Sequence, residues 1–256
     1  MRPTRRHILK GAAAAGAVTL LPFTARAAGH GGDAFMAEGG DVLVHPISHA
    51  SFVMETPAGV IYVDPVGEPA QYEGLPAAEL ILVTHEHGDH YNADTLAVLK
   101  GDNTTLITNP AVAGMVPDGL KANASQIGNG DSTDWNGVGI EAIPAYNLTE
   151  DRKNFHPEGR DNGYILNLPG LRVYVSGDTE DIPDMRALTG IDLAFVCMNL
   201  PFTMDVAAAA SAVNEFKPTY CYPYHYRGRD GGTQDPAALA ELVEGVEVRM
   251  GNWYGS

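Results

Sequence analysis

The sequence predicts an α/β protein in which two mixed β-sheets pack face to face with helices outside, a four-layer αβ/βα sandwich. Two observations lead to this class. From residue 40 onward, short apolar runs alternate with turns rich in Gly, Pro and Asp. In each half of the chain, several strand-like runs come first and strand-helix alternation follows, an order that favours helices on the outer faces of two sheets.

The strand candidates are short runs of β-branched and aromatic residues that end at turn residues. In the first half they are residues 42–47, 51–56, 60–64, 80–84, 104–108, 124–128 and 139–145. In the second half they are residues 163–168, 172–177, 193–198, 219–224 and 246–250.

The helix candidates are marked by capping residues at their starts. Proline is favoured at the first helical position, and two of the predicted caps are followed by proline. Predicted starts are Asn92, Asn109 with Pro110, and Asp235 with Pro236. Another helix is expected in "IPDMRAL" (182–188), and one in "MDVAAAASAVNEF" (204–216) with Thr203 as its cap.

The first 27 residues read as a twin-arginine signal peptide that exports the protein to the periplasm. Arg5 and Arg6 precede a weakly apolar run, and "ARA" (25–27) provides a small-x-small cleavage site. The run is shorter than the ~20 residues that span a bilayer, so no stable membrane anchor is expected. Residues 28–40 are expected to form a flexible leader, and residues 41–256 a single domain.

The charge of the chain is strongly negative. It is −16 for all 256 residues, and because the signal peptide holds five basic and no acidic residues it becomes −21 after cleavage. Such a surface disfavours nucleic acid and anionic lipid as partners. Cys197 and Cys221 lie in apolar strand-like runs and are expected to be buried thiols.

The sequence "THEHGDH" (84–90) places three histidines and an aspartate within six positions, directly after the apolar run "LILV". His85 and His87 are two apart, so an extended backbone points both imidazoles to one side. Gly88 then allows a turn that presents Asp89 and His90 in another direction. Imidazole and carboxylate are ligands of zinc and similar divalent ions, and two pairs that face two ways suit two metal ions.

This motif resembles the H-x-H-x-D-H signature of the metallo-β-lactamase superfamily. The chain looks most similar to the branch that contains ascorbate-6-phosphate lactonase and N-acyl-phosphatidylethanolamine phospholipase D. The resemblance covers residues 42–230 and includes "SHAS" (48–51), "VDP" (63–65), "SGDT" (176–179) and "YPYHY" (222–226). It implies the metallo-β-lactamase fold and a binuclear metal site.

The resemblance also implies the ligands. His85, His87 and a further histidine would hold the first ion, and Asp89, His90 and a distal histidine the second. By position, the distal histidine is His225 and the aspartate that bridges the ions is Asp178. Taken alone, Asp178 could be an ordinary Gly-Asp turn and His225 a histidine packed among tyrosines.

The sequence departs from the family pattern at the remaining histidine of the first ion. Where many members carry it, after the run "IPAY", this chain has Asn147, a poor zinc ligand. His156, nine residues later, is the favoured replacement. The alternatives are a weakly held first ion or a contribution from the Asn147 amide oxygen.

Four further residues are candidates for supporting ligands or for lining the substrate pocket. Asp64 ends a strand and could orient a ligand imidazole, and His49 matches a position near the pocket of relatives. Arg227 could hold a substrate anion, and Tyr91 adjoins the motif. A turn aspartate and a surface arginine are the ordinary interpretations of Asp64 and Arg227.

These residues predict a metal-dependent hydrolase with two divalent ions, zinc being expected and manganese or iron compatible. A hydroxide that bridges the ions would attack an ester, lactone or phosphodiester bond of a small molecule, with Asp89 and Asp178 as catalytic residues. Two alternatives remain. One is a non-catalytic periplasmic metal- or ligand-binding protein, motivated by Asn147, and the other is a β-lactamase.

Overall fold

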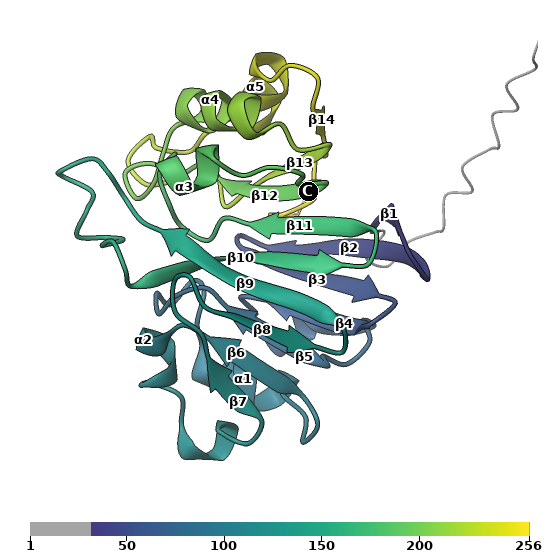
Figure 1. The fold of residues 1–256 in the computed structure, drawn as a ribbon. Helices are drawn as coiled ribbons and strands as arrows, with labels where there is room; N and C mark the ends of the chain where they lie inside the picture. Colours follow the sequence, from purple (N-terminus) through teal and green to yellow (C-terminus); the bar gives the residue numbers. More distant parts are fainter. Residues whose placement is uncertain (1–31, 256) are drawn as a thin grey trace, which may run out of the picture.

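The computed structural model describes residues 32–255, which form two seven-stranded sheets packed against each other (Figure 1). The signal peptide and the start of the leader lie outside the described residues. Each sheet is built from one contiguous half of the chain, and within each sheet the strands lie side by side in chain order. The expected sandwich of two mixed sheets is confirmed.

The first sheet pairs its first four strands antiparallel and the remaining strands parallel. Its strands are β1 (Asp33–Ala37), β2 (Gly40–Ser48), β3 (Ser51–Thr56), β4 (Gly59–Val63), β5 (Leu80–Val83), β6 (Thr105–Thr108) and β7 (Ala124–Gln126). The leader prediction was wrong at β1, because residues 33–37 pair with residues 40–44 of β2 and bury Phe35 in the core.

The second sheet repeats this arrangement, antiparallel over its first four strands and parallel beyond them. Its strands are β8 (Ser132–Trp135), β9 (Val138–Ala145), β10 (Asp161–Leu168), β11 (Leu171–Val175), β12 (Leu193–Cys197), β13 (Tyr220–Tyr224) and β14 (Glu247–Val248). The sequence reading missed β8, whose polar "STDW" lacks the apolar run that marks a strand.

Helices cover the outer faces of the sheets (Figure 1). They are α1 (Ala93–Leu99), α2 (Pro110–Ala113), α3 (Pro183–Arg186), α4 (Val206–Phe216) and α5 (Pro236–Leu242), with 3-10 turns at Pro69–Tyr72 and Asp118–Leu120. The predicted caps Asn92, Asn109 and Asp235 are confirmed, since each accepts a hydrogen bond from a helix amide. For α4 the cap is Asp205, which accepts from the Ala208 amide, and the Thr203 prediction was wrong.

Strand β5 shows how alternation builds the layers. All four residues are buried, because Leu80 and Leu82 join the core between the sheets while Ile81 and Val83 pack under α1 and α2. Between the sheets, Phe52 of β3 stacks on Phe195 of β12 at a ring distance of 4.0 Å. The backbone that carries "THEHGDH" is therefore fixed on both faces before it leaves the sheet.

Both cysteines, Cys197 and Cys221, are free and buried, as expected. Burial raises the pKa of each thiol to about 12, so both stay protonated at neutral pH. Within the part of the chain that the structure describes, no helix combines the length and hydropathy needed to cross a membrane.

Candidate metal centre

The candidate ligands meet where strands of both sheets end. His85 follows β5, Asp178 lies three residues beyond β11, and His225 follows β13. His49 occupies the turn between β2 and β3, and its carbonyl accepts a hydrogen bond from the His225 amide. Segments far apart in sequence are thus brought to one edge of the sandwich.

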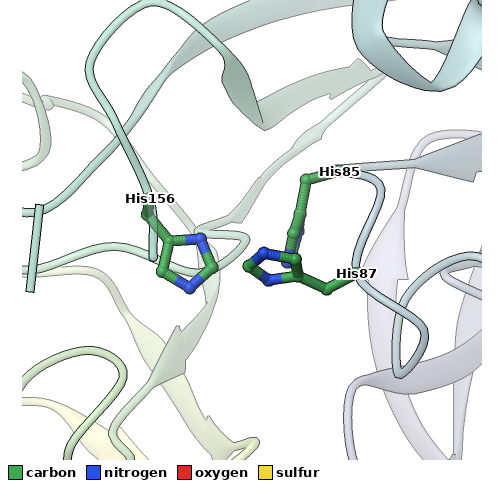
Figure 2. Close-up of side chains that lie close together, drawn as sticks. All are labelled: His85, His87 and His156. Atoms are coloured by element: carbon green, nitrogen blue, oxygen red, sulfur yellow. The ribbon is translucent and has the colours of Figure 1, made fainter. Parts of the chain in front are cut away.

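The first cluster consists of His85, His87 and His156, whose ligand nitrogens all lie within 4.8 Å of one another. Figure 2 shows His156 on a separate loop facing the two motif histidines. The ring centroid of His156 is 5.0 Å from that of His85 and 4.8 Å from that of His87. Three imidazoles at this spacing can hold one divalent ion and leave a position open.

The ligand atoms also lie within 4.8 Å of one another in two further clusters, His49 with Asp89 and His225, and His85 with His90 and Asp178. The resemblance groups His90 with Asp89 and His225, and the ring centroid of His90 lies 4.9 Å from that of His225. His90 also lies beside His85, with ring centroids 3.9 Å apart, and His49 is a further neighbour of Asp89 and His225. Every cluster takes two residues from the first half of the chain and one from the second.

Asp178 lies at the centre of the site. Its carboxylate oxygens are 3.4 Å from Nε2 of His90, 3.5 Å from Nε2 of His156 and 3.3 Å from Nε2 of His225. Burial alone would raise the pKa of Asp178, but these histidines hold it well below its usual range. Asp178 is therefore an anionic carboxylate in contact with histidines of all three clusters.

The protonation of His85 also suits metal binding. Complete burial, with His90 as the next cause, lowers the pKa of His85 well below 6.5. The imidazole is therefore neutral at physiological pH, which is the form that metals bind. For His225, burial acts to lower the pKa, but Asp178 and Asp89 outweigh it and raise the pKa to about 10.

The outer nitrogens of His85, His90 and His156 have partners. Nδ1 of His90 lies 2.8 Å from Oδ2 of Asp64, and Nδ1 of His156 lies 2.9 Å from Oδ2 of Asp161. Nδ1 of His85 lies 2.9 Å from the Thr84 hydroxyl, which itself donates to Asp64. Such contacts fix ring orientation and turn Nε2 inward. The prediction that Asp64 orients a ligand imidazole matches this geometry.

The inner atoms, by contrast, lack partners. Among residues 32–255, the buried atoms without any hydrogen bond include Nε2 of His85, His90 and His225 and Oδ1 of Asp178. A buried polar atom left unsatisfied costs roughly 1–3 kcal/mol, so several together at one point indicate a missing partner. Divalent cations fit these residues, because a cation would take the lone pairs of His85 and Asp178 directly and that of His225 once its proton is displaced.

The backbone is strained at three residues of the site. His49, Asp64 and His225 have φ values of 56°, 43° and 48°, in the left-handed region that non-glycine residues rarely adopt. Conformations of this kind cost about 1–3 kcal/mol each and persist where the surrounding structure requires them. Here they aim two imidazoles and the supporting carboxylate at the same centre.

The loop that carries His156 is held by residues at its start. The Asn147 amide donates to the His156 carbonyl at 2.9 Å, and its side-chain Nδ2 donates to the Phe202 carbonyl at 2.6 Å. Glu180 accepts from Arg152 at 2.8 Å and from the Leu148 amide at 2.7 Å. Asn147 thus helps to position the loop that presents His156, while its Oδ1 has no hydrogen bond within the described residues.

A cavity of about 500 Å³ opens beside the clusters. Its lining includes His49, Asp89 and Asp178, two aromatic residues, Phe155 and Phe202, and the arginines 227 and 229. Tyr91 does not belong to the pocket: its ring is buried beside α1 and its hydroxyl donates to the Met115 carbonyl at 3.2 Å. The prediction for Tyr91 was therefore wrong, since the chain turns it away from the motif's ligands.

Sequence reasoning missed four residues that the structure places at the site. Thr84 could have been found, because it adjoins the motif. Asp161 and Asn199 support His156 and His225 from distant segments, with the Asn199 amide 3.3 Å from Nδ1 of His225. Arg229 lines the cavity, but in sequence it reads as an ordinary loop residue.

Comparison with known proteins agrees with this geometry. The profile of the Beta-lactamase superfamily domain matches residues 44–225, and that of the twin-arginine translocation pathway signal sequence matches residues 2–22. A protein of Anaeromyxobacter sp. (strain K), named UPF0173 metal-dependent hydrolase, is 31% identical over 79% of this chain and 81% of its own length. A protein of the same name from Pyrococcus abyssi is 31% identical over 79% of this chain and 92% of its own.

Solved structures show the same architecture. A crystal structure of a candidate metal-dependent hydrolase from Parabacteroides distasonis has a TM-score of 0.77 and 40% identity, covering 86% of this chain and 97% of its own. A metallo hydrolase from Ignicoccus hospitalis, at 21% identity, shares the fold with a TM-score of 0.66, over 82% of this chain and 94% of its own. With its motif, its two sheets and this profile match, the chain belongs to the metallo-β-lactamase superfamily.

Proposed function

We propose that the protein is a metal-dependent hydrolase that cleaves an ester, lactone or phosphodiester bond of a small molecule in the periplasm. One observation carries the proposal: the inner atoms of His85, His90, His225 and Asp178 converge on one point, buried and without hydrogen bonds. A family of relatives named metal-dependent hydrolases supports it, as does the signal-sequence match for the export step.

The proposed ligands are those of the three clusters. His85, His87 and His156 would hold one ion and His49, Asp89 and His225 a second, and Asp178, with His90 beside it, contacts histidines of both sets. Zinc suits this imidazole-rich set, and manganese or iron could also bind it. Divalent ions held here supply Lewis acidity and lower the pKa of the water they bind towards neutrality.

Residues of the chain provide the remaining functions. Asp89, whose side chain is 47% exposed, faces the cavity and is placed to accept a hydrogen bond from the attacking water. His49 Nε2 lies 3.4 Å from Asp89 Oδ2 and restrains that carboxylate. Phe155 and Phe202, whose rings lie 5.1 Å apart, form an apolar wall that positions a small substrate.

Within the superfamily, we propose that the protein is related to the branch of ascorbate-6-phosphate lactonase and N-acyl-phosphatidylethanolamine phospholipase D. The segments that carry this resemblance, "SHAS", "VDP", "SGDT" and "YPYHY", contribute His49, Asp64, Asp178 and His225 to one site. A non-catalytic binding protein was motivated by the absence of a histidine at Asn147. The proximity of His156 to His85 and His87 supports it as the third imidazole and so favours the hydrolase.

The proposal is tested by metal content and chelator-sensitive turnover. Mature protein purified without chelators should contain close to two metal equivalents per chain. It should hydrolyse at least one substrate of a chromogenic ester, lactone and phosphodiester panel, and lose that activity when a chelator is added. Turnover that survives complete metal removal, or no turnover across the panel by the two-metal protein, contradicts the proposal. Nitrocefin in the same panel tests the β-lactamase alternative.

Substitution of Asp89 and Asp178 tests their proposed roles in hydrolysis. Asp89→Ala and Asp178→Ala should each lower kcat/KM by about 10³-fold or more. The residues of the site act as one unit, so the loss of a single member removes most of the rate enhancement. Asp118→Ala is the control, since Asp118 is an exposed partner of Lys121 away from the cavity. Circular dichroism must show that all three variants are folded. Undiminished turnover in either ligand variant excludes the assigned role.

A further inference from the structure

We propose that the substrate of this hydrolase is an anion whose acid group, a carboxylate or a phosphate, binds to Arg227 and Arg229 at the mouth of the metal cavity. The inference rests on the proposed function, because it names the class of substrate that the same cavity accepts. Both arginines line that cavity together with His49, Asp89 and Asp178.

Arg227 and Arg229 differ from the other arginines of the described region in their lack of a carboxylate partner. Residues 32–255 contain seven arginines, and five of them lie within 4.0 Å of a carboxylate. The paired ones are Arg152, Arg160, Arg172, Arg186 and Arg249. In the same described region, Arg227 and Arg229 form no ion pair, although this part of the chain carries many more acidic than basic residues. Their donors are free for a ligand.

Aromatic rings hold both guanidinium groups. The Cζ atom of Arg227 lies 4.0 Å from the ring centroid of Tyr254, and that of Arg229 lies 4.6 Å from the ring centroid of Phe202. Stacking on a ring face restrains the guanidinium plane and leaves its N–H edge available. A restrained planar fork is suited to bidentate binding of carboxylate or phosphate, and less rotamer entropy is lost on binding.

The backbone that carries the arginines is also fixed. The Arg229 amide donates to the Leu200 carbonyl at 3.1 Å, and the Leu200 amide donates to the Gly232 carbonyl at 3.0 Å. A Cβ atom built on Gly228 would lie 2.0 Å from the Leu200 carbonyl oxygen, so the loop packs against Leu200 too closely for any side chain. The two arginines are thus presented by a loop that is ordered before a ligand arrives.

The net negative charge of the described region explains why an anionic substrate needs local positive groups at the cavity. The 11 basic and 32 acidic residues between positions 32 and 255 give this region a formal charge of −21. An anionic substrate is repelled by that field unless local positive charge compensates. Two unpaired guanidinium groups beside a metal centre provide this compensation, and the cavity of about 500 Å³ limits the ligand to a small molecule.

The first experiment compares two esters with the same leaving group, 4-nitrophenyl acetate, which is neutral, and mono-4-nitrophenyl succinate, which carries a carboxylate. The metal-loaded wild-type protein should prefer the anionic ester in kcat/KM. In Arg227→Gln/Arg229→Gln this preference should fall roughly 10- to 100-fold, the effect of losing charge-assisted hydrogen bonds of about 1.5–3 kcal/mol. An unaltered preference in the double variant overturns the proposal.

A control variant separates the local effect from the change in net charge. Lys100→Gln/Lys121→Gln removes the same two charges outside the cavity and should keep the wild-type preference. An equal loss of preference in this control would assign the effect to the overall field and overturn the proposal.

The second experiment measures binding without turnover. Succinate and inorganic phosphate are titrated calorimetrically into the metal-loaded wild-type protein and both double variants. Weaker binding to Arg227→Gln/Arg229→Gln than to the lysine control supports the proposal, and the tighter of the two anions identifies a carboxylate or a phosphate substrate. Equal binding to both variants places the anion elsewhere and overturns it.

The experiments distinguish a failure of the proposed hydrolase function from a failure of the proposed anion site. If no substrate of the ester, lactone and phosphodiester panel is hydrolysed but anion binding depends on the arginines, the hydrolase function is wrong and the anion site stands. If esters are hydrolysed with no preference for charge and the arginine variant binds anions normally, the hydrolase function stands and the anion site is wrong.

Discussion

At the scale of single residues, the site depends on polar contacts to the Nδ1 atoms of its histidines, which orient the rings so that Nε2 faces the centre of the site. The clearest is between Asp161 and His156, which are both almost completely buried, with Nδ1 of His156 2.9 Å from Oδ2 of Asp161. The Asp161 carboxylate also accepts from Arg160 at 2.6 Å, which fixes its own orientation. This contact orients the imidazole that we propose as the replacement for the histidine missing at Asn147.

Asp161→Asn should therefore weaken metal binding. The substitution keeps the shape of the side chain but removes the charge that makes the His156 imidazole a stronger ligand, so metal affinity should fall roughly 10- to 100-fold. Competition with a chromophoric chelator measures this affinity directly. Asp118→Asn, an exposed position, is the matched control. If Asp161→Asn binds metal as tightly as the wild type, Asp161 has only a structural role.

At the scale of elements, the turn after β11 determines where Asp178 lies. Gly177 adopts a φ of 60°, and a Cβ atom added there would lie 2.6 Å from the Asn162 carbonyl oxygen of β10. Two requirements therefore coincide at one glycine, a left-handed backbone and a close approach to the neighbouring strand. The turn can deliver the central carboxylate only with glycine at this position.

Gly177→Ala should destabilise the protein more than Gly190→Ala. Gly190 has nearly the same φ, 64°, but no atom within 4 Å of the added Cβ. The control should thus lose only the cost of a left-handed alanine, about 1–2 kcal/mol. The clash at Gly177 should add roughly 1–3 kcal/mol and also lower metal content. Urea unfolding gives both free energies, and equal values for the two variants would contradict this account of the turn.

At the scale of the whole molecule, bound ions would link the two sheets. Each cluster combines two side chains from the first half of the chain with one from the second. A ligand that binds only the folded state stabilises it in proportion to its occupancy, by about 3 kcal/mol at a hundredfold excess over Kd. Metal binding at this site should therefore add to the stability that comes from packing the sheets.

Removal of metal should lower the Tm by roughly 5–10 °C, the shift that corresponds to about 3 kcal/mol for a protein of this size. Scanning calorimetry with and without a chelator measures it. In Asp178→Ala the difference between the two conditions should shrink, because the residue in contact with all three clusters is gone. Identical Tm values for the metal-saturated and the chelated wild-type protein would show that the clusters hold no ion in the folded state.

Much of the fold could be predicted from the sequence because apolar runs and caps act locally. The "LILV" run and the Asn92 cap are examples, and both are confirmed. The pairing of residues 33–37 could not be predicted, since an alternating five-residue strand in a glycine-rich leader has no strong local signal. In the site, "THEHGDH" could be recognised from the sequence because its candidate ligands lie within six positions. The contact of Asp161 with His156 could not be predicted, because it forms only when the loop that carries His156 folds back.

The distribution of ligands between the halves also bears on when the protein acquires its ions. A chain in which the two sheets have not yet met possesses none of the three clusters complete, so cation uptake has to follow folding. Proteins on the twin-arginine route cross the membrane already folded, and this chain carries the corresponding signal. The cations would accordingly be drawn from the cytoplasmic pool before translocation, and the supply of metal inside the cell, rather than outside it, would decide which element the exported protein contains.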